Sequence, residues 1–164
     1  MREVGTTALV ALLPAAEVLS AAIDPALVRA ELPAHVTIRY PFVPLSDAVA
    51  EVVAQQPAVT VELATLVEER GFVGLAVPEL EPVRAATLRR WPEPLPYGGR
   101  FGPAPPLHLT VAMGASADDA ARVREAVREL LPIRDRVVEL QLVELTSGGW
   151  RPQARFPLRC SRPG

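Results

Sequence analysis

The sequence predicts a single domain of mixed helices and strands, residues 1–164, in which the second half repeats the first. Short apolar runs bounded by Pro and Gly indicate strands, and polar N-cap residues ahead of longer segments indicate helices between them. Each half contains a His-x-Thr strand, a Ser-capped helix, a Pro and a hairpin-like pair of strands, over about residues 35–77 and 108–158. This repeat, low in sequence identity, indicates two similar lobes that place their motif strands side by side.

The first half opens with a continuous apolar run, residues 6–13, which predicts a central strand. A helical segment is expected near residue 15. A stronger helix start follows at Asp24-Pro25, where an N-cap precedes a Pro, and this helix should reach about residue 31. The later elements are a motif strand, a Ser-capped helix, an alternating strand and a strand after the Arg70-Gly71 turn, over residues 35–40, 46–55, 59–68 and 72–77.

The second half is expected to open with a helix over about residues 82–90, followed by a Pro- and Gly-rich loop over 91–106. A loop of this length inside a compact domain is often functional, and this one leads directly into the second motif. The later elements are a motif strand, a Ser-capped helix, a strand and, after the Gly148-Gly149 turn, a last strand, over residues 107–113, 116–131, 137–145 and 155–158.

The composition narrows the chemistry and the partners of the chain. All 17 basic residues are Arg, which excludes covalent lysine intermediates. The single cysteine, Cys160, excludes an internal disulfide and a multi-cysteine metal site. A formal net charge of -2 argues against a broad basic surface for long duplex nucleic acid. The apolar run at residues 6–13 is too short to cross a membrane, so we expect a cytoplasmic protein without a membrane partner.

The most informative feature is a pair of His-x-Thr motifs, His35-Val36-Thr37 and His108-Leu109-Thr110, which contain both histidines of the chain. Residues i and i+2 of a strand face the same side, so each His projects together with its Thr. In sequences of this composition, each of two histidines would be followed two residues later by Ser or Thr in only about 1% of cases by chance. The pairing therefore favours one shared site over two unrelated histidines that form only local hydrogen bonds.

Two histidines facing one cleft can act as general base and general acid near neutral pH, because each can take or give a proton there. Two threonine hydroxyls can hold the non-bridging oxygens of a phosphate and stabilise the charge that develops on them. This division of roles needs no metal ion. A two-histidine metal site would need a third ligand, and neither motif has a carboxylate or thiol at ligand spacing. We therefore expect no metal and no cofactor.

These motifs resemble those of the 2H phosphoesterase superfamily, especially its 2′-5′ RNA ligase-like and cyclic phosphodiesterase branch, and the resemblance covers nearly the whole chain. It implies an α+β fold with two antiparallel sheets flanking a central cleft and helices packed on the outside. It further implies metal-independent chemistry on 2′,3′-cyclic phosphates or 2′,5′-phosphodiesters, with possible reversal as an RNA ligase. By this resemblance His35 and His108 are the acid/base pair, while Thr37 and Thr110 bind phosphate.

The sequence departs from the family where many members carry an Arg shortly after the second motif, because Met113-Gly114 stands there. The phosphate charge must then be met from elsewhere. Arg39 would share the face of the first motif if its strand stays regular. The remaining candidates for contacts with substrate are two arginines in Gly-rich loops and two aromatics in the loop before the second motif, Arg100, Arg151, Tyr97 and Phe101.

Two classes of function follow. The first is an enzyme that acts on a small nucleotide or a short RNA end with a cyclic or 2′,5′ phosphate. The alternative is a sensor module that binds a nucleotide or phosphate without turnover. The presence of both histidines and both threonines favours the enzyme, and we expect a monomer. The sequence leaves open the base preference, the regiochemistry of ring opening, the direction of the reaction and which histidine is the base.

Overall fold

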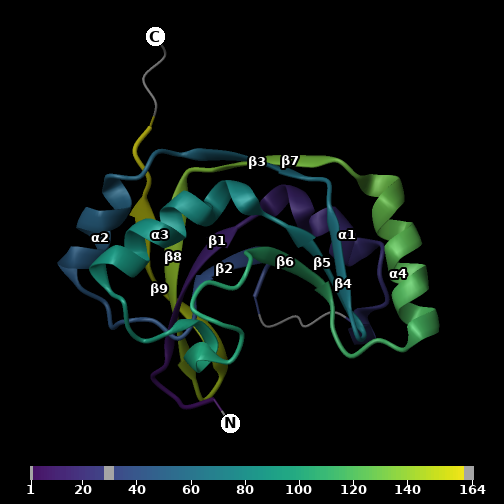
Figure 1. Cartoon of the computed structure of the whole chain (residues 1–164), viewed down its shortest axis with the longest axis horizontal. Helices are drawn as coiled ribbons and strands as arrows, with labels where there is room; N and C mark the ends of the chain where they lie inside the picture. The colour runs from purple at the N-terminus through teal and green to yellow at the C-terminus, as the bar shows by residue number, and fades with distance from the viewer. Residues whose placement is uncertain (1, 28–31, 161–164) are drawn as a thin grey trace.

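The computed structural model describes residues 2–27 and 32–160, and it has the predicted α+β architecture with antiparallel sheets (Figure 1). One sheet has seven strands in the order β4-β5-β6-β2-β1-β8-β9, and a second sheet pairs β3 with β7. The strands are β1 Thr7–Leu12, β2 His35–Arg39, β3 Val59–Leu63, β4 Leu66–Glu69, β5 Phe72–Ala76, β6 His108–Ala112, β7 Ile133–Val137, β8 Glu139–Thr146 and β9 Gly149–Pro157.

The helices are α1 Glu17–Ala21, α2 Asp47–Ala54, α3 Glu81–Arg90 and α4 Ala117–Leu130, with short 3-10 turns at η1 Pro14–Ala16, η2 Pro25–Leu27, η3 Pro78–Leu80 and η4 Pro96–Gly99. Ser46 and Ser116 occupy the N-cap positions of α2 and α4, but the Ser46 side chain forms no capping hydrogen bond. Ser116 Oγ accepts a hydrogen bond from the Asp119 backbone N–H at the start of α4. The Arg70-Gly71 turn joins β4 to β5 with both residues at positive φ, as a two-residue hairpin turn requires.

The two motif strands lie next to each other at the middle of the large sheet. β2 and β6 run antiparallel with Val36 opposite Leu109. β1 flanks β2 and β5 flanks β6, both antiparallel, so the arrangement is similar on the two sides of the Val36–Leu109 pair. The two histidine motifs therefore come from one continuous sheet rather than from two sheets that face each other.

The main hydrophobic core lies on one face of this sheet. It contains Val36 and Leu109 together with apolar side chains of the helices and of β3 and β7. The turn η1 contacts β7 and η3 contacts β3, which places the starts of α1 and α3 between the small sheet and the large one (Figure 1). Because alternate residues of a strand face opposite sides, the histidines and threonines of the motifs lie on the other face, away from this core.

Three expectations about strands need correction. Residues 59–68 are two strands in different sheets, because the chain leaves β3 at Ala64 and begins β4 at Leu66. The strand β7 was missed: only its end residues Ile133 and Val137 are buried, so it shows no apolar run. The last strand begins at Gly149 and not at residue 155, since most of β9 is exposed and its first residues form no apolar run.

The helix predicted at Asp24 is described only in part. Asp24 Oδ1 accepts a hydrogen bond from the Ala26 N–H, as expected for a cap, but the structure there is the 3-10 turn η2. The remainder of this prediction, residues 28–31, lies outside the described residues. The helical segment near residue 15 is confirmed and consists of η1 followed by α1.

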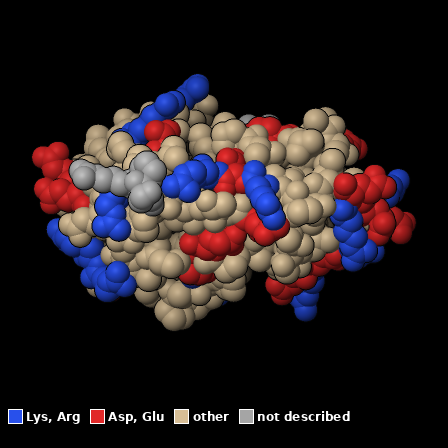
Figure 2. Space-filling model, turned by 90° about the horizontal axis from the view of Figure 1, so that it is seen from above, with Lys and Arg blue, Asp and Glu red and all other residues tan. Residues whose placement is uncertain are grey.

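The surface above β3 and β7 carries both signs of charge. Figure 2 shows acidic and basic side chains interspersed on this face, and the ion pair between Arg134 and Glu62 joins the two strands there. This mixture is unlike the continuous basic stripe that duplex nucleic acid needs. In the described part of the chain, each helix is too short or too polar to cross a membrane.

Candidate active site

The pairing of β2 with β6 brings the four motif side chains together on one face. Continuing the register from Val36–Leu109 places His35 opposite Thr110 and Thr37 opposite His108. Residues directly opposite each other share a face, so each histidine neighbours the threonine of the other motif. We call these four residues, His35, Thr37, His108 and Thr110, the quartet. The two histidines lie on its diagonal, where Cα atoms are about 7–8 Å apart. Both imidazoles therefore start from neighbouring positions on the same face of the sheet.

Both imidazoles are oriented by the same local contact. His35 Nδ1 lies 2.8 Å from the Pro33 carbonyl oxygen, and His108 Nδ1 lies 3.1 Å from the Pro106 carbonyl oxygen. A carbonyl oxygen can only accept a hydrogen bond, so Nδ1 is the protonated nitrogen in each ring. This tautomer leaves Nε2 of both neutral rings without a proton, and Nε2 is therefore the atom that can exchange protons with a ligand.

The environment of His35 favours its neutral form. Burial lowers the pKa of His35 below its ordinary value, and the charge of His108 acts in the same direction, while the hydrogen bond to Pro33 opposes both. The electrostatic influence of His108 agrees with the pairing register, which places the two rings near each other. A histidine held neutral near pH 7 is suited to accept a proton.

A pocket opens beside the quartet. It has a volume of about 260 Å³, part of it open to solvent. Thr37 and His108 contribute to its wall, whereas His35 and Thr110 lie outside the lining. The other lining residues are Ile38, Tyr40, Arg84, Pro96, Tyr97, Pro105, Pro106 and Leu107. Strand β2, helix α3 and the long loop before β6 thus meet at the histidine-bearing face.

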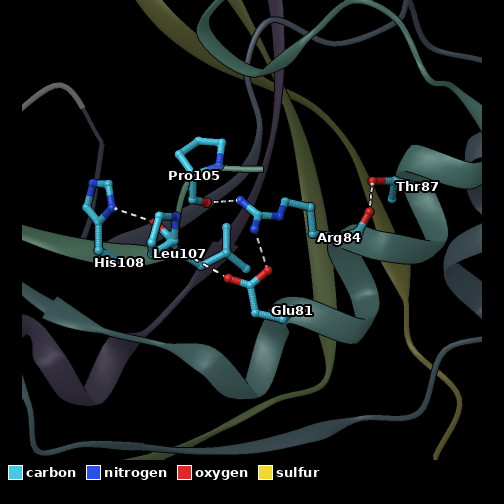
Figure 3. A network of polar contacts seen from close by, with 7 residues as sticks. Glu81, Arg84, Thr87, Pro105, Leu107 and His108 are labelled. Atoms are coloured by element: carbon cyan, nitrogen blue, oxygen red, sulfur yellow. Dashed lines mark hydrogen bonds and ion pairs between the residues drawn. The ribbon is translucent and has the colours of Figure 1, made fainter. Parts of the chain in front are cut away.

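Arg84 is the cation that the structure adds to the predicted site. It lies on α3, is only 4% exposed and lines the pocket. Its guanidinium donates to the Glu81 carboxylate and to the Pro105 carbonyl oxygen, two residues before Leu107 (Figure 3). Sequence reasoning missed Arg84 because α3 was read as a helix without a motif. Only its position three residues after Glu81, typical of a helix ion pair, was visible.

Tyr97 lies in the pocket, as predicted from its loop. Its backbone is left-handed, with φ 52° and ψ 31°, an unusual conformation for a non-glycine residue. Burial raises the pKa of Tyr97, although the nearby Arg84 guanidinium lowers it, so its hydroxyl stays protonated at neutral pH. The ring packs against Tyr40 at 5.7 Å and against Phe101 at 5.5 Å between centroids. Strained conformations of this kind are frequent at functional sites.

Phe72 on β5 extends the site beyond β6. Its ring meets the His108 ring edge to face, at 5.1 Å and 85°. The space for this ring comes from Gly74, which lies opposite Thr110, because a Cβ at Gly74 would stand 2.7 Å from Phe72 Cζ. The prediction of a strand over 72–77 gave no sign of this contact, since the pairing of β5 with β6 was not visible in the sequence.

Arg39 does not join the histidines. Ile38 forms a bulge in β2, since Thr37 pairs with Val10 and Arg39 pairs with the next residue, Leu9. The extra residue turns Arg39 toward the core, where it is 0% exposed. Its guanidinium donates to Thr87 Oγ1 and to the Pro94 carbonyl oxygen, and it lies 5.2 Å from the centre of the Phe42 ring. Arg39 thus joins α3 to the long loop and does not reach the pocket.

The other predicted substrate contacts are placed at different distances from the pocket. Phe101 packs on Tyr97 but is 59% exposed, and the Arg100 guanidinium lies 5.4 Å from the centre of the Phe101 ring. Both therefore stand at the rim. Arg151 is exposed on β9, opposite Glu144, and is not part of the lining. Among residues 2–27 and 32–160, His, Cys, Asp and Glu side chains form no group of three that could hold a metal ion.

Comparisons with known proteins identify the family and the fold of the chain. The model of the 2'-5' RNA ligase superfamily matches residues 11–149, and the chain belongs to this family. Two solved structures of E. coli LigT share the fold: the complex with 3'-AMP has 20% identity and a TM-score of 0.54, and the apo form has 16% and 0.56. Each comparison covers 96% of this chain and 99% of LigT. No curated protein sequence matches the chain.

Proposed function

We propose that this protein is a metal-independent phosphoesterase that acts on 2′,3′-cyclic phosphates or 2′,5′-phosphodiesters of a nucleotide or a short RNA end. One observation carries the proposal: His35 and His108 lie diagonally on one sheet face, each with Nδ1 held by a carbonyl and Nε2 free. Two such rings can serve one phosphorus atom from opposite sides. Membership of the 2'-5' RNA ligase superfamily supports the same reaction class.

In hydrolysis of a cyclic phosphate, we assign His35 as general base and His108 as general acid. His35 Nε2 takes a proton from water as the water oxygen bonds to phosphorus. His108 enters the step as an imidazolium, with protons on both nitrogens, and its Nε2–H gives its proton to the departing ribose oxygen as the P–O bond breaks. The lowered pKa of His35 supports the base role, because it keeps the ring unprotonated near neutral pH. A ribose 5′-hydroxyl in place of water would attack the same phosphorus, and a 2′,5′ linkage would form as the P–O3′ bond breaks and the 3′ oxygen takes the proton of His108. Cleavage of a 2′,5′ linkage is the reverse of this step, with the two histidines in exchanged roles.

The phosphate is expected to lie over the centre of the quartet. Thr37 and Thr110 supply hydroxyl donors to its non-bridging oxygens, and such donors stabilise the charge that grows as the phosphorane forms. Arg84 supplies positive charge at the pocket wall, where no Arg follows the second motif. Only one of its donors needs to face the ligand, since others hold Glu81 and Pro105.

The nucleoside is expected to extend from the quartet toward Tyr97. This ring lines the pocket and continues to Phe101 and Arg100 at the rim, and aromatic rings of this kind stack on bases. The complex of E. coli LigT with 3'-AMP supports a ligand of this size. A monomer in the cytoplasm stays our prediction.

The test is a substrate panel with EDTA present throughout. The four 2′,3′-cyclic nucleotides and a 2′,5′-linked dinucleotide are incubated with wild type and with His108→Ala, and the products are separated by chromatography. We expect wild type to open the cyclic phosphates and the variant to lose about 100- to 10,000-fold in rate. Binding of nucleotides without turnover would contradict the proposal and support the sensor alternative.

A further inference from the structure

Two glutamates make the same contact next to the two histidines. Glu17, the first residue of α1, accepts a hydrogen bond of 2.6 Å from the Ala34 backbone N–H. Glu81, the first residue of α3, accepts one of 3.1 Å from the Leu107 backbone N–H. Ala34 precedes His35 directly, as Leu107 precedes His108. Each motif histidine therefore follows a backbone amide that is bound by a carboxylate.

This amide belongs to the same peptide group that orients the imidazole. The Leu107 N–H and the Pro106 carbonyl form one peptide unit, and that carbonyl accepts the hydrogen bond from His108 Nδ1 (Figure 3). The Ala34 N–H and the Pro33 carbonyl form the corresponding unit beside His35. A carboxylate bound to the N–H end of a peptide increases the negative charge on its carbonyl oxygen, and chains of hydrogen bonds strengthen one another in this way.

The surroundings of the two contacts correspond, which argues against coincidence. The Leu13 N–H donates to the Ala34 carbonyl oxygen at 2.8 Å, and the Val77 N–H donates to the Leu107 carbonyl oxygen at 3.0 Å. Leu13 and Val77 each precede a Pro that opens a 3-10 turn, and each glutamate follows directly after that turn. The Pro-x-x-Glu spacing is thus the same after β1 and after β5. It carries the carboxylate back to the strand that bears the histidine.

We propose that Glu17 and Glu81 are positioning residues, each linked through one peptide group to a catalytic histidine. The carboxylate draws the amide proton, the carbonyl of the same peptide binds Nδ1–H more strongly, and Nε2 of the imidazole is kept free for proton exchange. The arrangement corresponds to a carboxylate–histidine pair with a peptide group inserted between its members. The expected kinetic effect rests on the proposed function, whereas the effect on the tautomer does not.

The contacts of Glu17 and Glu81 differ, because only Glu81 also binds an arginine. Glu81 also binds the Arg84 guanidinium, which in turn donates to the Pro105 carbonyl oxygen. The segment that leads into His108 is therefore held at Pro105 and at Leu107 by two neighbouring side chains of α3. This second hold fixes the position of the peptide, while the positive charge of Arg84 reduces the electrostatic effect of Glu81. We therefore expect the loss of a carboxylate to affect His35 more than His108.

A carboxylate that only satisfies a backbone amide would not influence a histidine, and Glu79 provides the control. Glu79 accepts a hydrogen bond of 2.6 Å from the Glu62 N–H on β3, a strand without a histidine. It lies two residues before Glu81 at the start of the same helical segment. Glu79→Gln therefore removes a carboxylate of the same type without touching either imidazole.

The experiment uses the two histidines as their own reporters. A long-range ¹H–¹⁵N spectrum of the free protein gives the tautomer of both rings separately, since the chain has only 2 histidines. It is recorded above pH 8 for wild type and for Glu17→Gln, Glu81→Gln and Glu79→Gln. Gln keeps an oxygen acceptor for the amide, so mainly the charge is lost. Because Glu81→Gln deprives Arg84 of its carboxylate, Glu81→Gln/Arg84→Gln is included as a second variant.

We expect the Nδ1–H form to dominate both rings in wild type. Glu17→Gln should lower the ratio of Nδ1–H to Nε2–H about two- to fivefold at His35 and leave His108 unchanged, and the Glu81 variants should lower it at His108 only. With a 2′,3′-cyclic nucleotide, kcat of the single variants Glu17→Gln and Glu81→Gln should fall about three- to tenfold while KM is kept. Unchanged tautomers in all folded variants, or an equal change in Glu79→Gln, would overturn the proposal. Failure of the proposed function would show instead as absent turnover in wild type.

Discussion

Replacing Gly74 with Ala should displace the ring that supports His108. A Cβ at this position would stand 2.7 and 2.9 Å from two atoms of the Phe72 ring and 3.0 Å from the Leu109 carbonyl oxygen. Carbon atoms in contact prefer about 3.5–4.0 Å, so the ring must withdraw by roughly 1 Å. Phe72 then loses its edge-to-face contact with His108. A glycine is therefore needed at position 74, because the Phe72 ring occupies the space that a Cβ would take.

The expected magnitudes follow from this geometry. Overpacking costs about 1–3 kcal/mol, and the lower entropy of the unfolded Ala variant returns about 0.4–1 kcal/mol, so the free energy of unfolding should fall by about 0.5–2 kcal/mol. An edge-to-face pair is worth about 0.5–1.5 kcal/mol. If that energy helps to hold His108 in its reactive position, kcat/KM should fall about two- to twelvefold.

The assay combines urea unfolding with initial rates on a 2′,3′-cyclic nucleotide for Gly74→Ala, Phe72→Leu and the double variant. If Gly74→Ala acts through the ring, the double variant should lose no more activity than Phe72→Leu alone. The control is Gly148→Ala, where the nearest atom stands 3.5 Å from the added Cβ and no histidine is close. Independent, additive losses in the double variant would refute the reasoning.

Three further predictions concern the two threonine hydroxyls, the independence of the reaction from metal ions and the pKa of His35. Thr37→Val and Thr110→Val should each lose about 100-fold in kcat with a nearly unchanged thermal midpoint, because each hydroxyl faces the pocket side and not the core; retained kcat in both would contradict the phosphate role. EDTA should leave kcat unchanged, and inhibition that zinc or magnesium reverses would show a metal requirement. Since the folded state lowers the pKa of His35, the unfolded chain binds that proton more readily, and stability should fall as the pH drops through about 6.5. His35→Gln should therefore lose less stability than wild type between about pH 7.5 and about pH 5 in denaturant titrations, and an equal loss would contradict the cause given for the shift.

Much of the fold could be predicted from the sequence because the strongest signals in it are local. Continuous apolar runs, the Ser116 cap and the Arg70-Gly71 turn act within a few residues, and each is found where expected. Ser46 also stands at the start of its helix, but its side chain forms no capping hydrogen bond. The strand β7 was missed because its two buried residues lie at its ends, and pairing with β3 decides its conformation. Alternation alone could not show that residues 59–68 belong to two sheets, since both strands expose one side.

For the site, the sequence supplied the four motif residues but not what surrounds them. His-x-Thr spacing in a strand is enough to put each pair on one face. Arg39 was assigned to that face by the same rule, and the bulge at Ile38 reversed it. Arg84 and Phe72 reach the site only through packing of α3 and β5 against the motif strands, and no spacing in the sequence encodes that contact. The repeated Pro-x-x-Glu spacing was present in the sequence, but its meaning needed the backbone hydrogen bonds.

We propose that His35 and His108 act on the same phosphorus atom in one step. The most direct test is the rate of hydrolysis of 2′,3′-cyclic AMP by His35→Ala, by His108→Ala and by the double variant, all with EDTA present. Groups that act as a unit are strongly non-additive, so the double variant should be about as slow as the slower single variant. Losses that simply multiply, or a single variant with the wild-type rate, would contradict a shared two-histidine site.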